Sequence, residues 1–240
     1  MVRLDQRLVE LGLAPSRARA QALIAAGAVE VGGTVVTKPG RKTEPEAVIR
    51  VTAEPNPWVS RAALKLDHAL DTFGLEPGGR ALDVGASTGG FTQVLLARGA
   101  AYVHALDVGH GQLHPTIAAD PRVIPHQGVN VREISEGLIP PVDWITADVS
   151  FISLAKALPR ALTLGLPGAH LVALVKPQFE VGPRQTGKGV VRDPALHRSA
   201  CEGVARFLSS SGWQVTGETE SPITGADGNR EFLIAAVKSD

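Results

Sequence analysis

The stretch Ala81–Gly90, A-L-D-V-G-A-S-T-G-G, ends a short apolar run and precedes F-T-Q-V-L-L-A-R. The apolar run predicts a strand, the glycines predict a tight turn, and the residues after Gly90 predict a helix. This order presents backbone N–H groups to a nucleotide-like ligand in α/β sheets. Ser87 stands where the dinucleotide fingerprint has its middle glycine, and Asp83 would repel a pyrophosphate. The pattern therefore favours a cationic cofactor without phosphates, such as S-adenosylmethionine.

Length, charge and cysteine content bound the class of protein. The 240 residues have room for one α/β domain and a small module, and 44% hydrophobic residues support an ordinary core. The net charge is zero, but residues 1–43 carry +4 and the remainder −4, which predicts an anionic partner for the N-terminal part. The single cysteine, Cys201, permits no internal disulfide. With no predicted membrane span or signal peptide, we expect a cytoplasmic protein without a membrane partner.

The first 50 residues predict a compact α+β module that is too small to be an enzyme. One helix is expected over 3–11, and a second follows Ser16, with Arg17, Arg19 and Gln21 on its outer face. A hairpin is expected around Gly32-Gly33. A solvated basic surface explains the cations of this module as well as RNA binding does on charge alone. The candidate RNA-phosphate contacts here are Arg3, Arg7, Arg17, Arg19, Lys38, Arg41 and Lys42.

The order of these features resembles the small RNA-binding domain first named for ribosomal protein S4. The resemblance covers R-L-D-Q-R-L-V-E-L-G-L-A-P-S-R-A-R-A-Q-A-L-I-A-A-G-A-V-E-V-G-G. It implies recognition of structured RNA by shape and backbone contacts. We place the S4-like domain at 1–53, a proline-containing linker at 54–60, and the second domain at 61–240.

Seven runs in the second domain predict a Rossmann-like sheet, mostly parallel, with the last strand antiparallel. A helix capped by Ser60 precedes the sheet. The carboxyl ends of parallel strands line the ligand crevice, and polar residues gather at those ends. Asp107, about twenty residues beyond the turn, suits a ribose, and Asn130 suits adenine. The candidate cofactor-binding residues are Asp83, Gly85, Ala86, Ser87, Thr88, Gly89, Gly90, Phe91, Asp107, Asn130 and Asp148.

Two lysines and two carboxylates at strand boundaries are candidates for acid–base chemistry. Lys176 follows a buried run, and burial beside a second cation, for which Lys65 is the candidate, would lower its pKa. A neutral amine can then accept a proton. Asp148 and Glu231 are the carboxylates that would hold both amines. From the residues alone, scattered salt bridges are the simpler explanation.

Five motifs in order resemble the TlyA family, the hemolysin-A-like rRNA 2′-O-methyltransferases whose catalytic domain is of the FtsJ type. They are W-V-S-R-A-A-L-K-L, A-L-D-V-G-A-S-T-G-G-F-T, A-D-V-S-F-I-S, L-V-K-P-Q-F-E and G-K-G-V-V-R-D. The resemblance implies methyl transfer from S-adenosylmethionine to a ribose 2′-hydroxyl of cytidine in ribosomal RNA. It implies ribosomal subunits as the partner, and we expect no obligate protein partner. The implied catalytic tetrad falls on Lys65, Asp148, Lys176 and Glu231.

Several further residues and functions remain open at this stage. Phe151 is expected either to stack on the target base or to fill a gap under its loop, and His110 and His114 lack the third ligand of a metal site, so no metal is expected. The alternative functions are a membrane-active cytolysin, a non-catalytic RNA-binding factor and methylation of a base. Further candidate RNA contacts are Arg61, Arg184, Lys188 and Arg192.

Overall fold

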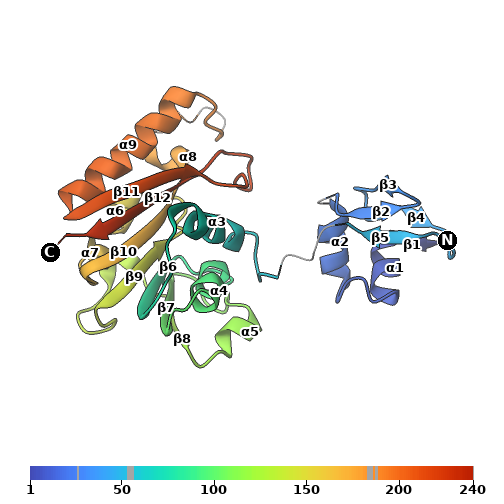
Figure 1. Ribbon diagram of the computed structural model, residues 1–240, viewed down its shortest axis with the longest axis horizontal. Coiled ribbons are helices and arrows are strands. Elements are labelled where there is room, and N and C mark those ends of the chain that lie inside the picture. The colour runs from blue at the N-terminus through green and yellow to red at the C-terminus, as the bar shows by residue number, and fades with distance from the viewer. Residues whose placement is uncertain (26, 53–56, 183–185, 187–188, 240) are drawn as a thin grey trace. The chain divides into compact units, whose positions relative to one another are not determined.

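The computed structural model describes residues 1–25, 27–52, 57–182, 186 and 189–239 (Figure 1). The chain divides into two compact units, Met1–Pro57 and Trp58–Asp240. The first unit has one hydrophobic core, and the second has one on each face of its sheet. No helix within the described ranges has both the length and the apolar character needed to cross a membrane.

The N-terminal unit packs two helices against short antiparallel strands. Its core joins Leu4 and Leu8 of the first helix to Leu23 and Ile24 of the second. The predicted hairpin is present, and both of its turn glycines have positive φ, which suits a two-residue turn. The elements are β1 (Val2–Arg3), α1 (Leu4–Glu10), α2 (Arg17–Ala25), β2 (Val29–Val31), β3 (Thr34–Val35), β4 (Lys42–Thr43) and β5 (Ile49–Val51).

The outer face predicted for the second helix is confirmed for Arg17, whose side chain is 52% exposed, whereas Arg19 and Gln21 are only partly exposed. The prediction did not include the hydrogen bonds that Arg17 and Gln21 both donate to the carboxylate of Asp5 on α1. Asp5 is fully buried, and a buried carboxylate requires such donors. The prediction treated each helix alone and so missed a contact between two helices.

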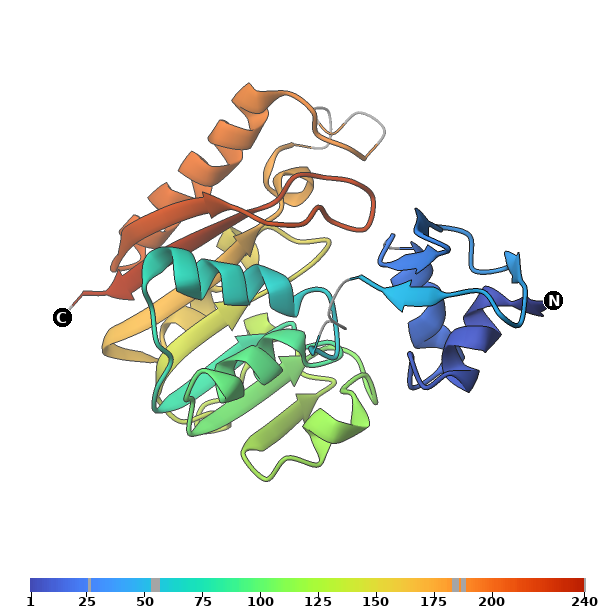
Figure 2. The same cartoon turned by 45° about the vertical axis from the view of Figure 1, so that its right-hand side comes forward.

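The C-terminal unit is built on a seven-stranded sheet with the order β11-β12-β10-β9-β6-β7-β8. The strands from β6 to β10 pair in parallel, and β12 pairs antiparallel with both β10 and β11. The predicted sheet of seven mostly parallel strands with an antiparallel last strand is confirmed; that strand is red in Figure 2. The strands are β6 (Arg80–Val84), β7 (Tyr102–Asp107), β8 (Val123–Gln127), β9 (Val142–Ala147), β10 (Gly165–Val175), β11 (Trp213–Glu220) and β12 (Phe232–Lys238).

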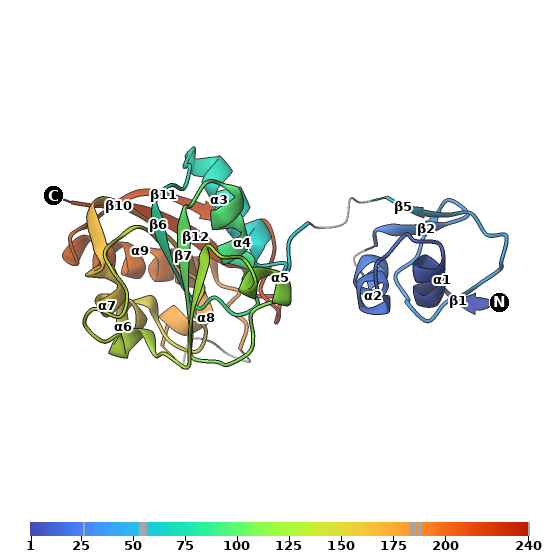
Figure 3. The same ribbon diagram turned by 90° about the horizontal axis from the view of Figure 1, so that it is seen from below.

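Helices cover both faces of this sheet (Figure 3). Alternation along β6 directs Leu82 and Val84 into the core under α6, α7 and α9, and Ala81 into the core under α3 and α4. Both faces are therefore buried, as a parallel sheet requires. The helices are α3 (Ala63–Phe73), α4 (Gly90–Ala97), α5 (Pro115–Ala118), η1 (Val131–Glu133), α6 (Leu154–Ala157), α7 (Pro159–Leu162), α8 (Pro177–Glu180) and α9 (Pro194–Ser210).

Strand register brings chemically active residues to one end of the sheet. Val175 pairs with Phe232, so Lys176, which follows β10, and Glu231, which precedes β12, lie on neighbouring strands. Ala147 pairs with Val84, so Asp148 lies beside the glycine turn. Residues far apart in the sequence are therefore neighbours because the parallel strands end at the same edge.

The predicted helix cap at Ser60 was wrong. Helix α3 begins at Ala63, its N-cap is Ala62, and no side chain caps it. The Ser60 hydroxyl is buried without a hydrogen-bond partner among the described residues. Its Oγ instead lies against Gly90, at the end of the glycine turn.

Candidate active site

Two ion pairs unite the four candidate catalytic residues. Lys65 Nζ on α3 lies 2.5 Å from Glu231 Oε2, and the side chains are 9% and 3% exposed. Lys176 Nζ lies 2.6 Å from Asp148 Oδ1 at the ends of β10 and β9. Each lysine therefore has a carboxylate that fixes its position, and the scattered salt bridges considered from the sequence are instead two pairs at one edge of the sheet.

Lys176 has a second polar neighbour. Its Nζ donates a hydrogen bond to Ser150 Oγ at 2.8 Å. Both Lys176 and Ser150 line a cavity of about 260 Å³ beside the glycine turn, and Asp148 lines it too. The amine is therefore held from two sides while it faces an open space.

The glycine turn is shaped by close backbone packing. Gly85 has φ of +82°, and a Cβ at this position would lie 2.5 Å from the carbonyl oxygen of Asp148. Ser87, the departure from the dinucleotide fingerprint, also has positive φ, and its N–H donates to Asp107 Oδ2 at 2.8 Å. The turn thus presses against the end of β9 on one side and is fixed by Asp107 on the other.

A larger cavity of about 590 Å³ adjoins the turn, within the size range of sites for drug-sized ligands. Asp107, Asn130 and Asp148 line it, as do Gly85 and Ser87. The two oxygens of Asp107 accept from the N–H groups of Ser87 and Gly109, and each oxygen keeps a lone pair for a ligand hydroxyl. Three polar residues predicted at separate strand ends therefore share one cavity wall.

The other predicted cofactor residues divide between the cavity walls and the protein interior. Ala86, Thr88, Gly90 and Phe91 line the smaller cavity. Gly89 does not appear in either wall: it is the N-cap of α4, has φ of +90°, and packs against Ile117.

Asp83 is buried beneath the turn, in neither cavity wall. Its carboxylate oxygens accept hydrogen bonds from Thr92 Oγ1 at 2.6 Å and Thr146 Oγ1 at 3.0 Å. Burial raises the pKa of the Asp83 carboxyl to about 6, despite these hydrogen bonds. Asp83 therefore links β6 to α4 and β9 under the turn, and the direct ligand contact expected from the sequence is not what this geometry offers.

Ser60 is the residue that sequence reasoning missed. It lines the smaller cavity together with Lys176, and its Oγ packs so tightly on Gly90 that a Cβ there would collide with it. A buried hydroxyl without a partner carries a desolvation cost that a bound polar group would remove. In the sequence, Ser60 stands in W-V-S-R directly before the predicted helix, and this position predicts a helix cap.

Phe151 stands at the mouth of the larger cavity. It is 90% exposed and has φ of +65°, an uncommon conformation for a residue with a side chain. Its ring contacts only the tilted ring of Phe179, at 5.3 Å between centroids, among the described aromatic residues. Gap filling under the loop, one of the two roles expected for it, is excluded by this exposure.

The candidate RNA-binding residues lie in two groups. In the N-terminal unit Arg3 and Arg17 contact Asp5, Arg7 pairs with Glu10, and the others lie at or near the surface. In the C-terminal unit Arg61 and Arg192 are exposed. Arg184 and Lys188 lie outside the described residues.

Sequence reasoning also missed a basic hollow of about 440 Å³ beside the site. Arg132, Lys156 and Arg160 line it, and no carboxylate of the described residues does. Arg132 also lines the larger cavity, so positive charge continues from the cavity to the outer surface. The residues come from three short helices that the sequence pattern did not bring together. No group of His, Cys, Asp and Glu within the described ranges could hold a metal ion.

Comparisons with known proteins agree with this geometry. The FtsJ-like methyltransferase family matches residues 58–238, and the S4 domain family matches residues 2–49. The chain is 46% identical to the 16S/23S rRNA (cytidine-2′-O)-methyltransferase TlyA of Mycobacterium tuberculosis, over 97% of this chain and 88% of that protein. It is 38% identical to Hemolysin A of Brachyspira hyodysenteriae, over 97% of this chain and 98% of that protein.

A solved structure is similar over the entire chain. It is described as a candidate hemolysin from Streptococcus thermophilus, and it matches 100% of this chain and 89% of its own with a TM-score of 0.78 and 38% identity. The hemolysin name is therefore attached to proteins that share this methyltransferase fold.

Substitution Asp83→Asn should change how stability depends on pH. The pKa of this carboxyl is about 6 in the folded chain and about 4 in an unfolded one, so it destabilises the native state increasingly as pH rises from about 4 to about 6. The variant should therefore gain stability relative to wild type over that interval, by up to about 3 kcal/mol. Urea unfolding followed by tryptophan fluorescence tests this, because all three tryptophans lie in the C-terminal unit. A difference that is constant with pH would contradict it.

Proposed function

The chain belongs to the TlyA family of FtsJ-like methyltransferases, and we propose that it methylates a ribose 2′-hydroxyl of a cytidine in ribosomal RNA with S-adenosylmethionine as methyl donor. The observation that carries the proposal is the pair of lysine–carboxylate contacts beside the glycine turn. An amine that faces the cavity, Lys176, and a second amine at the same end of the sheet, Lys65, suit deprotonation of a hydroxyl, whereas chemistry on a base would favour an aromatic pocket. The N-terminal unit, which the S4 domain family matches and which we call the S4 unit, supports an RNA substrate.

The residues around the turn fit S-adenosylmethionine. The larger cavity has room for the adenosine part, with Asp107 available to the ribose hydroxyls and Asn130 to the adenine edge. The smaller cavity offers the unpartnered Ser60 hydroxyl to the amino acid part of the cofactor. Gly85 and Ser87 line both cavities, so a ligand that bridges them would pass directly over the turn.

When bound, the cofactor would supply a methyl group on a positively charged sulfur. Attack by the ribose oxygen on the methyl carbon would break the carbon–sulfur bond and leave the sulfur as a neutral thioether. Lys176 is proposed to accept the hydroxyl proton, because its Nζ faces the smaller cavity and needs no further movement of the backbone. Asp148 holds that amine, and Glu231 holds Lys65, which would orient the hydroxyl. The remaining rate acceleration would come from alignment of the ribose oxygen, the methyl carbon and the sulfur, with the reacting atoms within about 3–3.5 Å of each other.

Phe151 is proposed to stack on the target base. If the target nucleotide is paired, it must leave the RNA stack to reach the turn, and an exposed ring beside the cavity replaces the lost stacking. The adjoining cations Arg132, Lys156 and Arg160 suit phosphates of the same strand.

The first experiment measures methyl transfer from radiolabelled S-adenosylmethionine to unmodified ribosomal subunits. Label should survive alkaline hydrolysis as a 2′-O-methyl dinucleotide, because a methylated 2′-oxygen cannot attack the neighbouring phosphate. Lys176→Ala should lower kcat by about 10²-fold or more, since it removes the proton acceptor. Arg206→Ala, which removes an exposed cation on α9, is the matched control and should transfer methyl at the wild-type rate. Tight RNA binding without label would instead indicate a non-catalytic factor.

Gly85→Ala should weaken cofactor binding, because the new methyl group would meet the Asp148 carbonyl at 2.5 Å and displace either the turn or β9. We expect at least about a tenfold rise in the Kd for S-adenosylmethionine, measured by calorimetry. Gly137→Ala is the matched control: Gly137 also has positive φ, but no atom lies within 4 Å of its added Cβ. Wild-type affinity in Gly85→Ala would contradict the role of the close approach, and an equal loss of affinity in both variants would indicate that backbone strain is responsible.

Phe151→Ala should raise the KM for ribosomal RNA by about tenfold and leave the Kd for S-adenosylmethionine unchanged, because base–aromatic stacking contributes about 1–3 kcal/mol. Phe151→Trp should restore the KM, since the larger ring also stacks. Tyr102→Ala is the control, as Tyr102 is 52% exposed at the opposite end of the sheet. A wild-type KM for Phe151→Ala would overturn the stacking role.

A further inference from the structure

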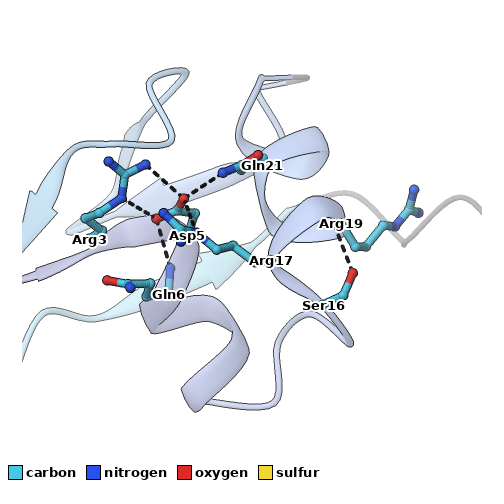
Figure 4. Close-up of polar contacts among 7 residues, drawn as sticks. All are labelled: Arg3, Asp5, Gln6, Ser16, Arg17, Arg19 and Gln21. Atoms are coloured by element: carbon cyan, nitrogen blue, oxygen red, sulfur yellow. Dashed lines mark hydrogen bonds and ion pairs between the residues drawn. The ribbon is translucent and has the colours of Figure 1, made fainter.

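The carboxylate of Asp5 in the N-terminal unit accepts several hydrogen bonds from neighbouring elements (Figure 4). Arg3 donates from Nε and Nη2 to its two oxygens, both at 3.0 Å. Arg17 Nε and Gln21 Nε2 donate to Oδ2 at 3.0 and 2.8 Å, and the N–H of Gln6 donates to Oδ1 at 3.0 Å. Five donors from β1, α1 and α2 therefore meet at one side chain.

Asp5 is a permanent negative charge inside the unit. It is fully buried, and its hydrogen bonds with Arg3 hold the pKa of its carboxyl well below its ordinary value, against the effect of burial. Gln21 and Arg17 act in the same direction. The carboxylate thus stays ionised throughout the pH range in which an RNA-binding protein works.

The two arginines each have one end in this network and one end in solvent. Their side chains are 42% and 52% exposed, whereas Asp5 is at 0%. Arg3 Nη2 and Arg17 Nε both lie 3.0 Å from Asp5 Oδ2, so these nitrogens are within twice that distance of each other. Arg19 points away from this group in Figure 4. Two like charges are therefore held together by a buried counter-charge, and both arginine side chains remain partly exposed.

Further cations lie on the loop that packs against the same residues. The N–H groups of Leu4 and Asp5 donate to the carbonyls of Arg41 and Pro39. Arg3 Nη1 lies beside Gly40, where a Cβ would stand 3.3 Å from it. Gly40 also lines a hollow of about 540 Å³ with Lys38 and Arg41. Arg3, which Asp5 holds, therefore lies beside a loop that carries two further cations, Lys38 and Arg41.

We propose that Asp5 is a positioning residue for RNA binding: it presets the guanidinium groups of Arg3 and Arg17 as a pair that receives a backbone phosphate of the ribosomal RNA. The proposal rests on the proposed function. Free arginine side chains lose rotamer entropy when they bind, and a buried anchor removes most of that cost beforehand. A phosphate then meets N–H groups already directed outward.

A purely structural role for Asp5 would produce different results. In that case Asp5 only joins α1 to α2, and its loss weakens every property of the unit equally. If Asp5 acts through the two arginines, its loss changes RNA affinity only while those arginines are present. A double-mutant cycle separates the two cases.

The experiment measures the Kd of the full-length protein for ribosomal RNA by filter binding over a range of salt concentrations. Asp5→Asn should weaken binding by about tenfold and reduce the slope of log K against log [salt], because fewer phosphates are neutralised. kcat and the Kd for S-adenosylmethionine should be unchanged. In an Arg3→Gln/Arg17→Gln background, adding Asp5→Asn should cause no further loss. An additional tenfold loss there would overturn the proposal.

Asp5→Asn could also lower the stability of the S4 unit, and faster hydrogen exchange in α1 and α2 would detect this. A second variant keeps the test decisive in that case. Arg3→Lys/Arg17→Lys retains both charges but removes the planar fork that Asp5 holds. It should lose about as much affinity as Asp5→Asn. Arg50→Lys, at an exposed arginine of β5, is the matched control and should bind as wild type. Wild-type affinity of the double lysine variant would show that charge alone is sufficient.

The two proposals fail in distinguishable ways. If wild type binds ribosomal RNA but transfers no methyl group, the proposed function fails while the binding cycle still tests Asp5. If wild type methylates ribosomal RNA and Asp5→Asn has an unchanged KM and Kd for it, only the Asp5 proposal fails.

Discussion

The buried ion pair between Lys65 and Glu231 is the contact on which the site depends. It joins α3 to the start of β12 across 166 positions of sequence, and both side chains are almost completely shielded from water. An unpaired charge in that position would be strongly destabilising, so each residue requires the other. The pair therefore fixes α3, and with it the preceding Ser60, against the carboxyl ends of the parallel strands.

Backbone packing at the turn is the second constraint. Gly85 allows the turn to touch the end of β9, and Gly90 allows Ser60 to touch the start of α4. These two close approaches bring Asp148 and Ser60 to the same cavity as Lys176. Any side chain at either glycine would separate the groups that the ion pairs hold. The ion pair between Lys176 and Asp148 and the close packing at the two glycines thus shape the same cavity.

The strand ends were predictable from the sequence because the geometry of a parallel sheet is regular. Once the apolar runs are assigned, Asp107, Asp148 and Lys176 must emerge at one edge. The family resemblance placed Lys65 and Glu231 in one tetrad with Asp148 and Lys176, and the structure shows which lysine pairs with which carboxylate. What could not be predicted depends on contacts between elements: Asp83 lies under the turn because two threonines from α4 and β9 meet it there. No pattern along β6 distinguishes that position from one facing the ligand.

Contacts between elements were also missed in the S4 unit, and they follow the same arrangement as in the active site. Periodicity placed Arg17 on an outer face, which is correct for its exposed tip but not for the end that Asp5 binds. In both units a shielded carboxylate fixes a basic side chain: Asp5 holds arginines, and Glu231 holds Lys65. A carboxylate in the interior neutralises each cation within the fold and also determines where its donors point. In the proposed function, the cations that meet RNA in a set orientation each have an anion behind them, and the sequence separation between the partners ranges from 2 positions to 166.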